Sequence, residues 1–164
     1  MNSSNAVTIR KATAADVPLI LHFIRALADY EKLLDLVSAT EAKLQATLFG
    51  ERPAAETLLA YLGEQPVGFA LFFQNYSTFL AQPGIYLEDL FVNPDARGNG
   101  IGLALIQAIA KIAVERGCAR MDWAVLDWNT PAIEFYHRIG ALPQTEWTTQ
   151  RLVGDALVKM AGGK

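Results

Sequence analysis

The chain has 164 residues, of which 52% are apolar and 19% charged, and this composition is typical of one folded domain over residues 1–164. A chain of this length buries enough surface to fold without a disulfide framework or a structural metal. Its 14 basic and 17 acidic side chains give a net charge of −3 without a basic block, which argues against a nucleic-acid binder and favours a cationic substrate.

The pattern of residues 7–50 predicts one strand followed by two helices. The alternation at Val7–Ile9 is typical of a strand. A capping-box pattern at Thr13–Asp16 precedes apolar residues at helical spacing, which predict a helix to about Leu34. A second capping pattern at Ser38–Glu41 predicts another helix, which Gly50 ends.

Three strands are predicted next. Thr57–Leu62 and Val67–Phe73 are rich in strand-forming residues, and the glycine and proline between them predict a hairpin turn. Ile85–Val92 is apolar on both faces except at Glu88 and Asp89, which is the pattern of a central strand covered on two sides.

The second half of the chain alternates helices and strands. Apolar residues at helical spacing from Ile101 onward predict a long helix, which Gly117 ends. A strand is expected at Met121–Val125. A short helix at Pro131–Ile139 and a last strand or strands within Leu142–Val153 complete the chain. The predicted fold is therefore mixed α/β, with a mixed central sheet and helices on both faces.

A glycine-rich loop, Arg97–Gly102, joins the central strand to the long helix. Backbone N–H groups and the helix dipole favour an anion there, and the spacing of the glycines suits a diphosphate; the alternative is a flexible turn. The loop has neither the lysine nor the hydroxyl of a Walker P-loop. It also fails the dinucleotide fingerprint, because Leu103 and Leu105 stand where that motif needs its third glycine or alanine.

Two carboxylates interrupt the central strand, and burying them there costs several kcal/mol unless they are solvated, paired or protonated. Glu88 and Asp89 therefore indicate a cleft, or else a pair at a strand end that faces water. Strand alternation places them on opposite faces unless a bulge intervenes.

The short C-terminal helix contributes a tyrosine and a cap. Ala132, Phe135 and Ile139 form its core stripe, and Tyr136 lies on the flank of that stripe. On periodicity alone, a tyrosine at the edge of the core is the better interpretation of Tyr136. Asn129 is expected to cap the helix.

Several segments together resemble the GNAT family of N-acetyltransferases, most closely the diamine (spermidine/spermine) acetyltransferases and their relatives that acetylate thialysine. The resemblance covers nearly the whole chain in element order. It is densest at Tyr86–Val92, at Arg97–Gly102 and at Trp128–Tyr136, and Tyr30–Glu31 adds to it. The loop Asn75–Phe79 lacks the acid of the polyamine enzymes, which brings the chain closer to the thialysine-type relatives.

The resemblance implies a sheet splayed around acetyl-CoA, a homodimer, and a tyrosine, Tyr136, that protonates the departing thiolate. An alkylammonium has a pKa near 10, so a base must take its proton, and Glu88, directly or through water, is the candidate. Glu31, Glu88 and Asp89 form a negative rim for a cationic amine, with Tyr30 beside them. The cofactor-binding residues are expected to be Leu90, Phe91, Val92, Arg97, Gly98, Asn99, Gly100, Ile101, Gly102, Leu103, Asn129, Thr130, Pro131 and Ala132.

Two other functions stay open: a non-catalytic acyl-CoA-binding or regulatory domain, and an acetyltransferase for a protein lysine or N-terminus. No metal is expected, because Cys118 is a lone cysteine, interpreted as a small buried residue, and His22 and His137 are interpreted as helix-face residues. No apolar run reaches the roughly 18 residues of a membrane span and no leader pattern is present, so the protein is expected to be cytoplasmic.

Overall fold

The structure, a computed structural model, describes residues 6–163. It divides into two compact units, Met1–Ala124 and Val125–Lys164. The single domain over residues 1–164 therefore stays a prediction. Within residues 6–163, every helix is too short or too polar to cross a lipid bilayer.

The first unit is built on a mixed sheet with the strand order β1-β2-β3-β4-β5. The first four strands pair antiparallel with their neighbours, and β5 pairs parallel with β4. The strands are β1 (Val7–Lys11), β2 (Glu56–Leu62), β3 (Gln65–Ser77), β4 (Gln82–Val92) and β5 (Met121–Asp122). The predicted hairpin and central strand are confirmed, while β5 is shorter than the predicted Met121–Val125.

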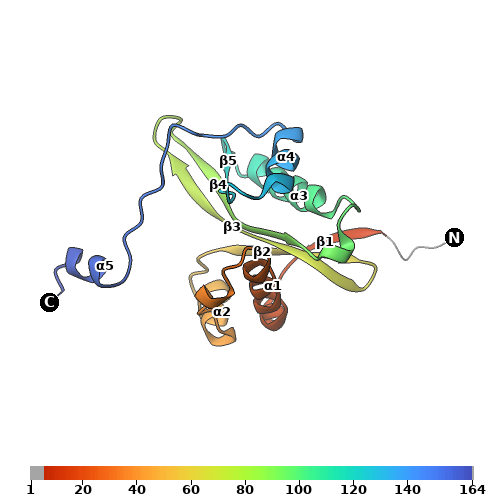
Figure 1. The fold of residues 1–164 in the computed structure, drawn as a ribbon, viewed down its shortest axis with the longest axis horizontal. Coiled ribbons are helices and arrows are strands. Elements are labelled where there is room, and N and C mark those ends of the chain that lie inside the picture. Colours follow the sequence, from red (N-terminus) through yellow and green to blue (C-terminus); the bar gives the residue numbers. More distant parts are fainter. Residues whose placement is uncertain (1–5, 164) are drawn as a thin grey trace. The chain divides into compact units, whose positions relative to one another are not determined.

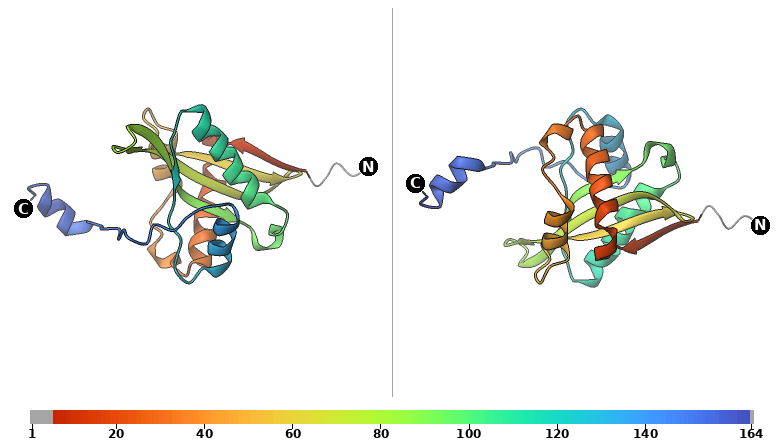
Figure 2. Two further views of the ribbon diagram at one scale, coloured as in Figure 1. Left: turned by 90° about the horizontal axis from the view of Figure 1, so that it is seen from above. Right: turned by 90° about the horizontal axis from the view of Figure 1, so that it is seen from below.

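Helices cover both faces of this sheet, as predicted. Figure 1 and the two views of Figure 2 show α1 (Val17–Tyr30) and α2 (Glu41–Leu48) on one face and α3 (Ile101–Glu115) on the other. Three short 3-10 turns, η2 (Ala14–Asp16), η3 (Leu34–Leu36) and η4 (Pro94–Ala96), join these elements.

The core between α1 and the sheet is aromatic. Phe23 of α1 stacks on Phe69 of β3 with ring centroids 5.5 Å apart, and its ring lies 6.3 Å from that of Phe91 in β4. All three side chains are buried. The helical spacing seen in the sequence of α1 is thus the spacing of its buried face, which fixes α1 against the C-terminal half of β4.

The ends of the first two helices differ from the prediction in detail. The capping box before α1 is confirmed, because Thr13 N–H donates to Asp16 Oδ2 at 2.7 Å. The cap of α2 is Thr40 rather than Ser38: the Thr40 backbone is extended, and its Oγ1 accepts a hydrogen bond from Lys43 N–H at 3.2 Å.

Helix α1 ends at Tyr30, four residues before the predicted end at Leu34. Lys32 N–H donates to Asp29 O at 3.0 Å, and Leu33 N–H donates to Ala28 O at 2.8 Å, which is the Schellman pattern. Lys32 adopts the left-handed conformation, with φ +62°, that this motif requires. Glycine normally occupies that position, so the sequence carried no signal for the helix end.

The second unit contains α4 (Thr130–Arg138) and α5 (Gly154–Met160). The predicted helix at Pro131–Ile139 is confirmed within one residue at each end. The predicted strand within Leu142–Val153 is wrong: this segment is irregular and exposed, and α5 follows it. A strand requires a hydrogen-bonded partner, and in the described part of the chain this segment pairs with none.

Candidate active site

A β-bulge at Glu88 determines which way the end of β4 faces. Leu71 of β3 pairs with Asp89, and the next residue, Phe72, pairs with Leu87, so Glu88 is an extra residue in β4. Before the bulge, Ile85 N–H donates to Arg120 O at 3.0 Å, toward β5.

After the bulge, the alternation of the backbone is reversed. Asn93 N–H donates to Val67 O at 2.8 Å, so Asn93 faces β3 although it is an even number of residues from Ile85. Alternation along the strand then turns the backbone groups of Leu90 and Val92 toward the β5 side and those of Phe91 toward β3.

Strand β5 does not follow β4 to its end. Met121 and Asp122 pair with Ile85 and Tyr86, and among the described residues β4 continues from Leu87 to Val92 without β5 beside it. The edge of β4 that carries Leu90 and Val92 is therefore available to pair with an extended ligand. This edge leads directly into the loop at residues 93–100.

The carboxylates of the central strand gather with one at the end of α1. Asp89 shares a face of the sheet with the buried Phe91, which is the face that α1 covers. Burial, together with the smaller effect of the charges of Glu88 and Glu31, raises the pKa of Asp89 to about 6. Burial also raises the pKa of Glu31. The acidic rim expected from the sequence is thus one cluster, and the bulge that could bring Glu88 and Asp89 together is present.

The burial of the three carboxylates differs. Glu88 is exposed, whereas Glu31 and Asp89 are partly buried. The two partly buried carboxyl groups hold their protons more tightly than carboxyl groups in water do. A cation placed in the rim would stabilise the ionised forms of Glu31 and Asp89.

The glycine-rich loop has the conformation expected of an anion cradle. Gly98 and Gly100 have φ +84° and +73°, and a Cβ added to either would meet no atom within 4 Å, so both sites are open. Asn99 Nδ2 donates to Ala96 O at 3.0 Å and holds the turn. The first intrahelical bond of α3 is Ala104 N–H to Gly100 O, at 2.9 Å.

This start of α3 leaves the N–H groups of the first turn, at Ile101, Gly102 and Leu103, without intrahelical acceptors. They lie at the positive end of the helix dipole. Arg97 adds a formal positive charge to the same loop, and its Nε donates to Val92 O at 3.2 Å. The loop can therefore hold an anion of about diphosphate size.

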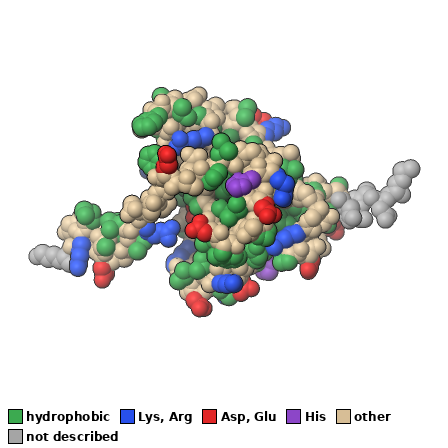
Figure 3. Space-filling model, turned by 45° about the horizontal axis from the view of Figure 1, so that its top comes forward, with side chains coloured by type: hydrophobic (Ala, Val, Ile, Leu, Met, Phe, Trp, Pro, Cys, Tyr) green, Lys and Arg blue, Asp and Glu red, His purple; other side chains and the backbone are tan. Residues whose placement is uncertain are grey.

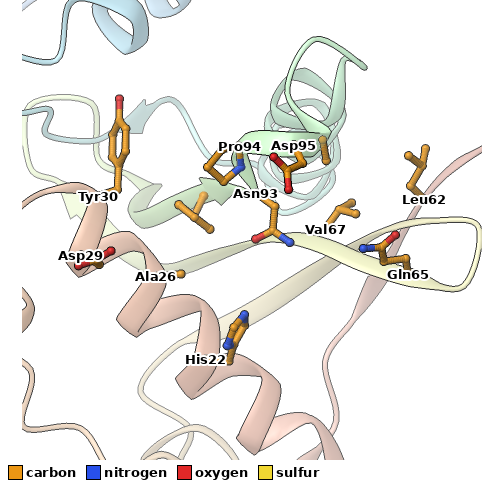
Figure 4. Close-up of a pocket in the computed structure, with 12 residues that line it drawn as sticks. His22, Ala26, Asp29, Tyr30, Leu62, Gln65, Val67, Asn93, Pro94 and Asp95 are labelled. Atoms are coloured by element: carbon orange, nitrogen blue, oxygen red, sulfur yellow. The ribbon is translucent and has the colours of Figure 1, made fainter.

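An open groove of about 500 Å³ lies between α1 and the end of β4 (Figure 4). Helix α1 contributes one face of its surface, with residues 22, 26, 29 and 30, and the β2–β3 hairpin, the end of β4 and residues 93–96 supply the rest. The lining residues are His22, Ala26, Asp29, Tyr30, Leu62, Gln65, Val67, Phe91, Asn93, Pro94, Asp95 and Ala96. Sequence reasoning singled out Tyr30 and Phe91 among them. The helical spacing of 22, 26, 29 and 30 was the signal that could have indicated the rest of this face of α1.

The remaining predicted site residues lie in the second unit. Asn129 caps α4 as predicted, with its Oδ1 accepting a hydrogen bond from Ala132 N–H at 3.4 Å. The ring of Tyr136 lies 5.4 Å from that of Phe135, its neighbour in the helix. The catalytic role of Tyr136 and the cofactor contacts of Asn129–Ala132 stay predictions.

No group of three or more His, Cys, Asp or Glu side chains within residues 6–163 is arranged to hold a metal ion. Cys118 is partly exposed rather than fully buried. On the face shown in Figure 3, acidic and basic side chains are scattered among apolar ones.

Comparisons with known proteins agree with this geometry. Residues 24–141 match the model of the Acetyltransferase (GNAT) family. The chain is 41% identical to a thialysine N-epsilon-acetyltransferase of Bos taurus, covering 95% of this chain and 98% of that protein. It is 36% identical to the L-ornithine N5-acetyltransferase NATA1 of Arabidopsis thaliana, over 91% of this chain and 85% of that protein. An integron cassette protein of V. cholerae has a similar fold, with a TM-score of 0.79 at 30% identity over 98% of this chain and 99% of that chain.

Proposed function

The chain belongs to the GNAT family of acetyltransferases and is an N-acetyltransferase, and we propose that it transfers the acetyl group of acetyl-CoA to the primary amine of a small cationic substrate. The family and the fold class predicted from the sequence are confirmed. The observation that carries the proposal is the unpaired edge of β4 that runs into an anion-binding loop.

The cofactor site that we propose follows this edge. Acetyl-CoA supplies the acetyl group as a thioester. The loop Arg97–Leu103 binds its diphosphate through the first-turn N–H groups of α3 and the Arg97 guanidinium. The N–H groups of Leu90 and Val92 donate to the amide and thioester oxygens of the cofactor. Phe91 lies between them in β4, and its backbone groups, which face β3, hold this part of the strand in the sheet. Asn129–Ala132 at the start of α4 contact the same molecule in this proposal.

The amine site that we propose is the acidic cluster at the end of α1. Glu31 and Asp89 attract the cationic substrate, and Tyr30 lies beside them. Support comes from the relatives, which are named for thialysine and ornithine, two amino acids that carry a second amine. A small molecule with two amines, one reacting and one held by a carboxylate, suits this cluster better than a neutral amine.

In the proposed reaction, the neutral amine attacks the thioester carbon directly. Glu88, which is exposed to solvent, takes the proton of the alkylammonium, directly or through water. As the C–N bond forms and the C–S bond breaks, the Leu90 N–H stabilises the negative charge on the carbonyl oxygen. The Tyr136 hydroxyl gives its proton to the departing sulfur, and the resulting phenolate takes up the second proton that the nitrogen loses on becoming a neutral amide.

The proposal also includes the assembly of the site. Tyr136 belongs to the second unit and Glu88 to the first, so a single domain over residues 1–164 is needed for both to act on one substrate. We propose that this domain works as a cytoplasmic homodimer without a metal, and that it binds neither nucleic acid nor membrane.

The experiment that tests the proposal is an amine panel. The purified chain is incubated with acetyl-CoA and thialysine, ornithine, lysine, linear diamines, spermidine, or a lysine-containing peptide, and free thiol is recorded. We expect turnover with small amines that carry two positive charges. Turnover with the peptide alone would favour a protein acetyltransferase. If CoA gives calorimetric heat but no amine reacts, the chain is a binding domain and the proposed reaction is wrong.

A further inference from the structure

The side chain of Arg97 is held at two points by residues outside its own loop. Its guanidinium carbon lies 4.6 Å from the centroid of the Tyr30 ring, at the end of α1. Its Nε donates to Val92 O at 3.2 Å, on the unpaired edge of β4. Arg97 thus bridges the end of α1 and the end of β4, two segments about sixty residues apart in the sequence.

Both contacts leave the outer guanidinium nitrogens able to bind an anion. The guanidinium carbon of Arg97 lies over the ring of Tyr30, a cation–π contact in which the positive charge rather than a hydrogen bond is the source of the attraction. Nε is used by Val92, and the two Nη groups remain at the in-plane edge that can donate to two oxygens at once. Such a fork matches two oxygens of a phosphate group.

Tyr30 is itself fixed by the structure around it. It is the last residue of α1, and the two Schellman hydrogen bonds made by Lys32 and Leu33 hold the chain directly after it. Its side chain packs at the border of the aromatic core. The ring therefore offers a fixed surface to an arginine that is otherwise exposed and would sample many rotamers.

We propose that Tyr30 is a positioning residue for cofactor binding, which holds the guanidinium of Arg97 in the orientation that receives the diphosphate. The inference rests on the proposed function, because it needs CoA to bind at the loop. It gives Tyr30 a different role from the substrate contact that its family resemblance implies. The ring face performs this role, so a phenylalanine at position 30 retains it and an aliphatic residue loses it.

Calorimetry of CoA binding to the full-length chain tests the proposal. We expect Tyr30→Leu to weaken CoA binding about 3-fold, which is the value of an exposed cation–π contact, and Tyr30→Phe to bind within about 1.5-fold of wild type. Arg97→Ala should weaken binding about 10-fold. In the Arg97→Ala background, Tyr30→Leu should have no further effect, because the contact is already gone.

Steady-state kinetics separates positioning from a merely structural role. Tyr30→Leu should raise the KM for acetyl-CoA about 3-fold, while kcat and the KM for the amine stay within 2-fold of wild type. Tyr76→Leu is the matched control: it removes an exposed tyrosine from the β3–β4 hairpin, remote from the loop, and should leave every constant unchanged.

A second variant keeps the test decisive if Tyr30→Leu does not fold. Arg97→Lys retains the positive charge and leaves α1 untouched, but lysine has no flat face to lay on the ring. We expect CoA binding about 3-fold weaker than wild type, and insensitive to Tyr30→Phe.

Two results would overturn the inference while the proposed function stands: CoA affinity equal to wild type in Tyr30→Leu, or CoA affinity equal to wild type in Arg97→Lys. If the wild-type chain itself gives no heat with CoA, the proposed function and the inference are both wrong.

Discussion

At the scale of single residues, Asp89 combines an ionisable group with a partly buried position in the middle of a core strand. Its pKa of about 6 lies above its ordinary value of 3.8 because burial disfavours the charged form and the charges of Glu88 and Glu31 add to that effect. An ionised carboxylate in this position lowers the free energy of unfolding, but it supplies a negative charge at the proposed amine site. The sequence showed the carboxylate, and only the structure shows which of the adjacent pair is buried.

Replacing Asp89 by asparagine should therefore stabilise the protein at neutral pH. A raised pKa means that the folded state holds the proton more tightly, so stability falls as the pH rises from about 4 through about 6. Asp89→Asn should raise the free energy of unfolding at pH 7 by up to about 3 kcal/mol, and the gain should vanish at pH 4 or below. Urea denaturation at both pH values measures this, with the exposed Asp35→Asn as control. A destabilised Asp89→Asn protein at pH 7 would contradict it.

The same ionisation should control amine binding. Below pH 6 Asp89 is neutral and attracts a cation weakly, whereas above pH 6 its charge is present. We expect the KM for the amine to fall several-fold as the pH rises from 5 to 7, while the KM for acetyl-CoA changes little. Initial rates across this range provide the measurement. In Asp89→Asn the step near pH 6 should be absent, and its persistence there would assign the step to another group.

Ala81 is the other non-glycine residue besides Lys32 with a positive φ in the described chain, at +51° in the β3–β4 turn. A Cβ makes this left-handed conformation costly. Ala81→Gly should raise the free energy of unfolding by about 0.5 to 1 kcal/mol, after the added entropy of the unfolded glycine is subtracted. Thermal melting checks this. Ala15→Gly, at an exposed position with ordinary φ, should instead lower the free energy of unfolding. If both substitutions changed that free energy in the same direction, the left-handed backbone of Ala81 would not be the cause.

At the scale of elements, helices and strands were predictable where one segment's own pattern decides its structure. The apolar spacing of α1 and α3 and the apolar run of β4 each describe a buried face, so their positions followed from the sequence. The bulge at Glu88 was foreseen as a possibility but not located, since it depends on pairing with β3. The strand expected within Leu142–Val153 failed for the same reason: apolar residues favour a strand, but a strand also needs a partner.

The C-terminal end of helix α3 is tied to strand β2 by one carboxylate. Glu56 of β2 accepts hydrogen bonds from both Nη atoms of Arg116, at 2.6 and 2.9 Å, and pairs with Lys11 Nζ at 3.1 Å. These hydrogen bonds, above all those from Arg116, hold the pKa of Glu56 below its usual value.

Glu56→Gln should therefore lower the free energy of unfolding by about 1 kcal/mol at pH 7, a value discounted because the pair is partly exposed. A lowered pKa gives stability that is present above the ordinary pKa of 4.5 and lost as the pH falls below it. The difference between Glu56→Gln and wild type should thus disappear in acid. Glu64→Gln, in the exposed β2–β3 turn, is the control. An unchanged difference at pH 3 would show that the charge is not responsible.

At the scale of the whole molecule, the proposed reaction needs groups from both units. The first unit carries the edge of β4, the glycine loop and the acidic cluster. The loop and the two carboxylates of β4 were predicted from loop and strand patterns, whereas a sheet splayed around the cofactor was expected only from the family resemblance. The contact between Arg97 and Tyr30 could not, because nothing in the spacing of two such distant residues indicates that they meet. The place of Tyr136 depends on the packing of a helix whose periodicity favoured a core-edge role.

Tyr136→Phe tests whether the second unit takes part in the chemistry. Loss of a proton donor to sulfur should lower kcat at least about 10-fold and leave CoA affinity within 2-fold of wild type. Free-thiol release and calorimetry measure the two quantities, and Tyr76→Phe, in the β3–β4 hairpin, should match wild type in both. A Tyr136→Phe enzyme with full turnover would show that the thiolate leaves without help from this residue.

The extra residue in β4 makes the length of that strand as important as its composition. Removing one position between Leu87 and Val92 would keep nearly every side-chain type, yet it would exchange the amides that face β3 for those on the open side. A family member that has lost such a position could preserve the loop, the acids and the core and still present the wrong amides to its thioester. Insertions and deletions in this short stretch are therefore expected to abolish catalysis more completely than most substitutions there.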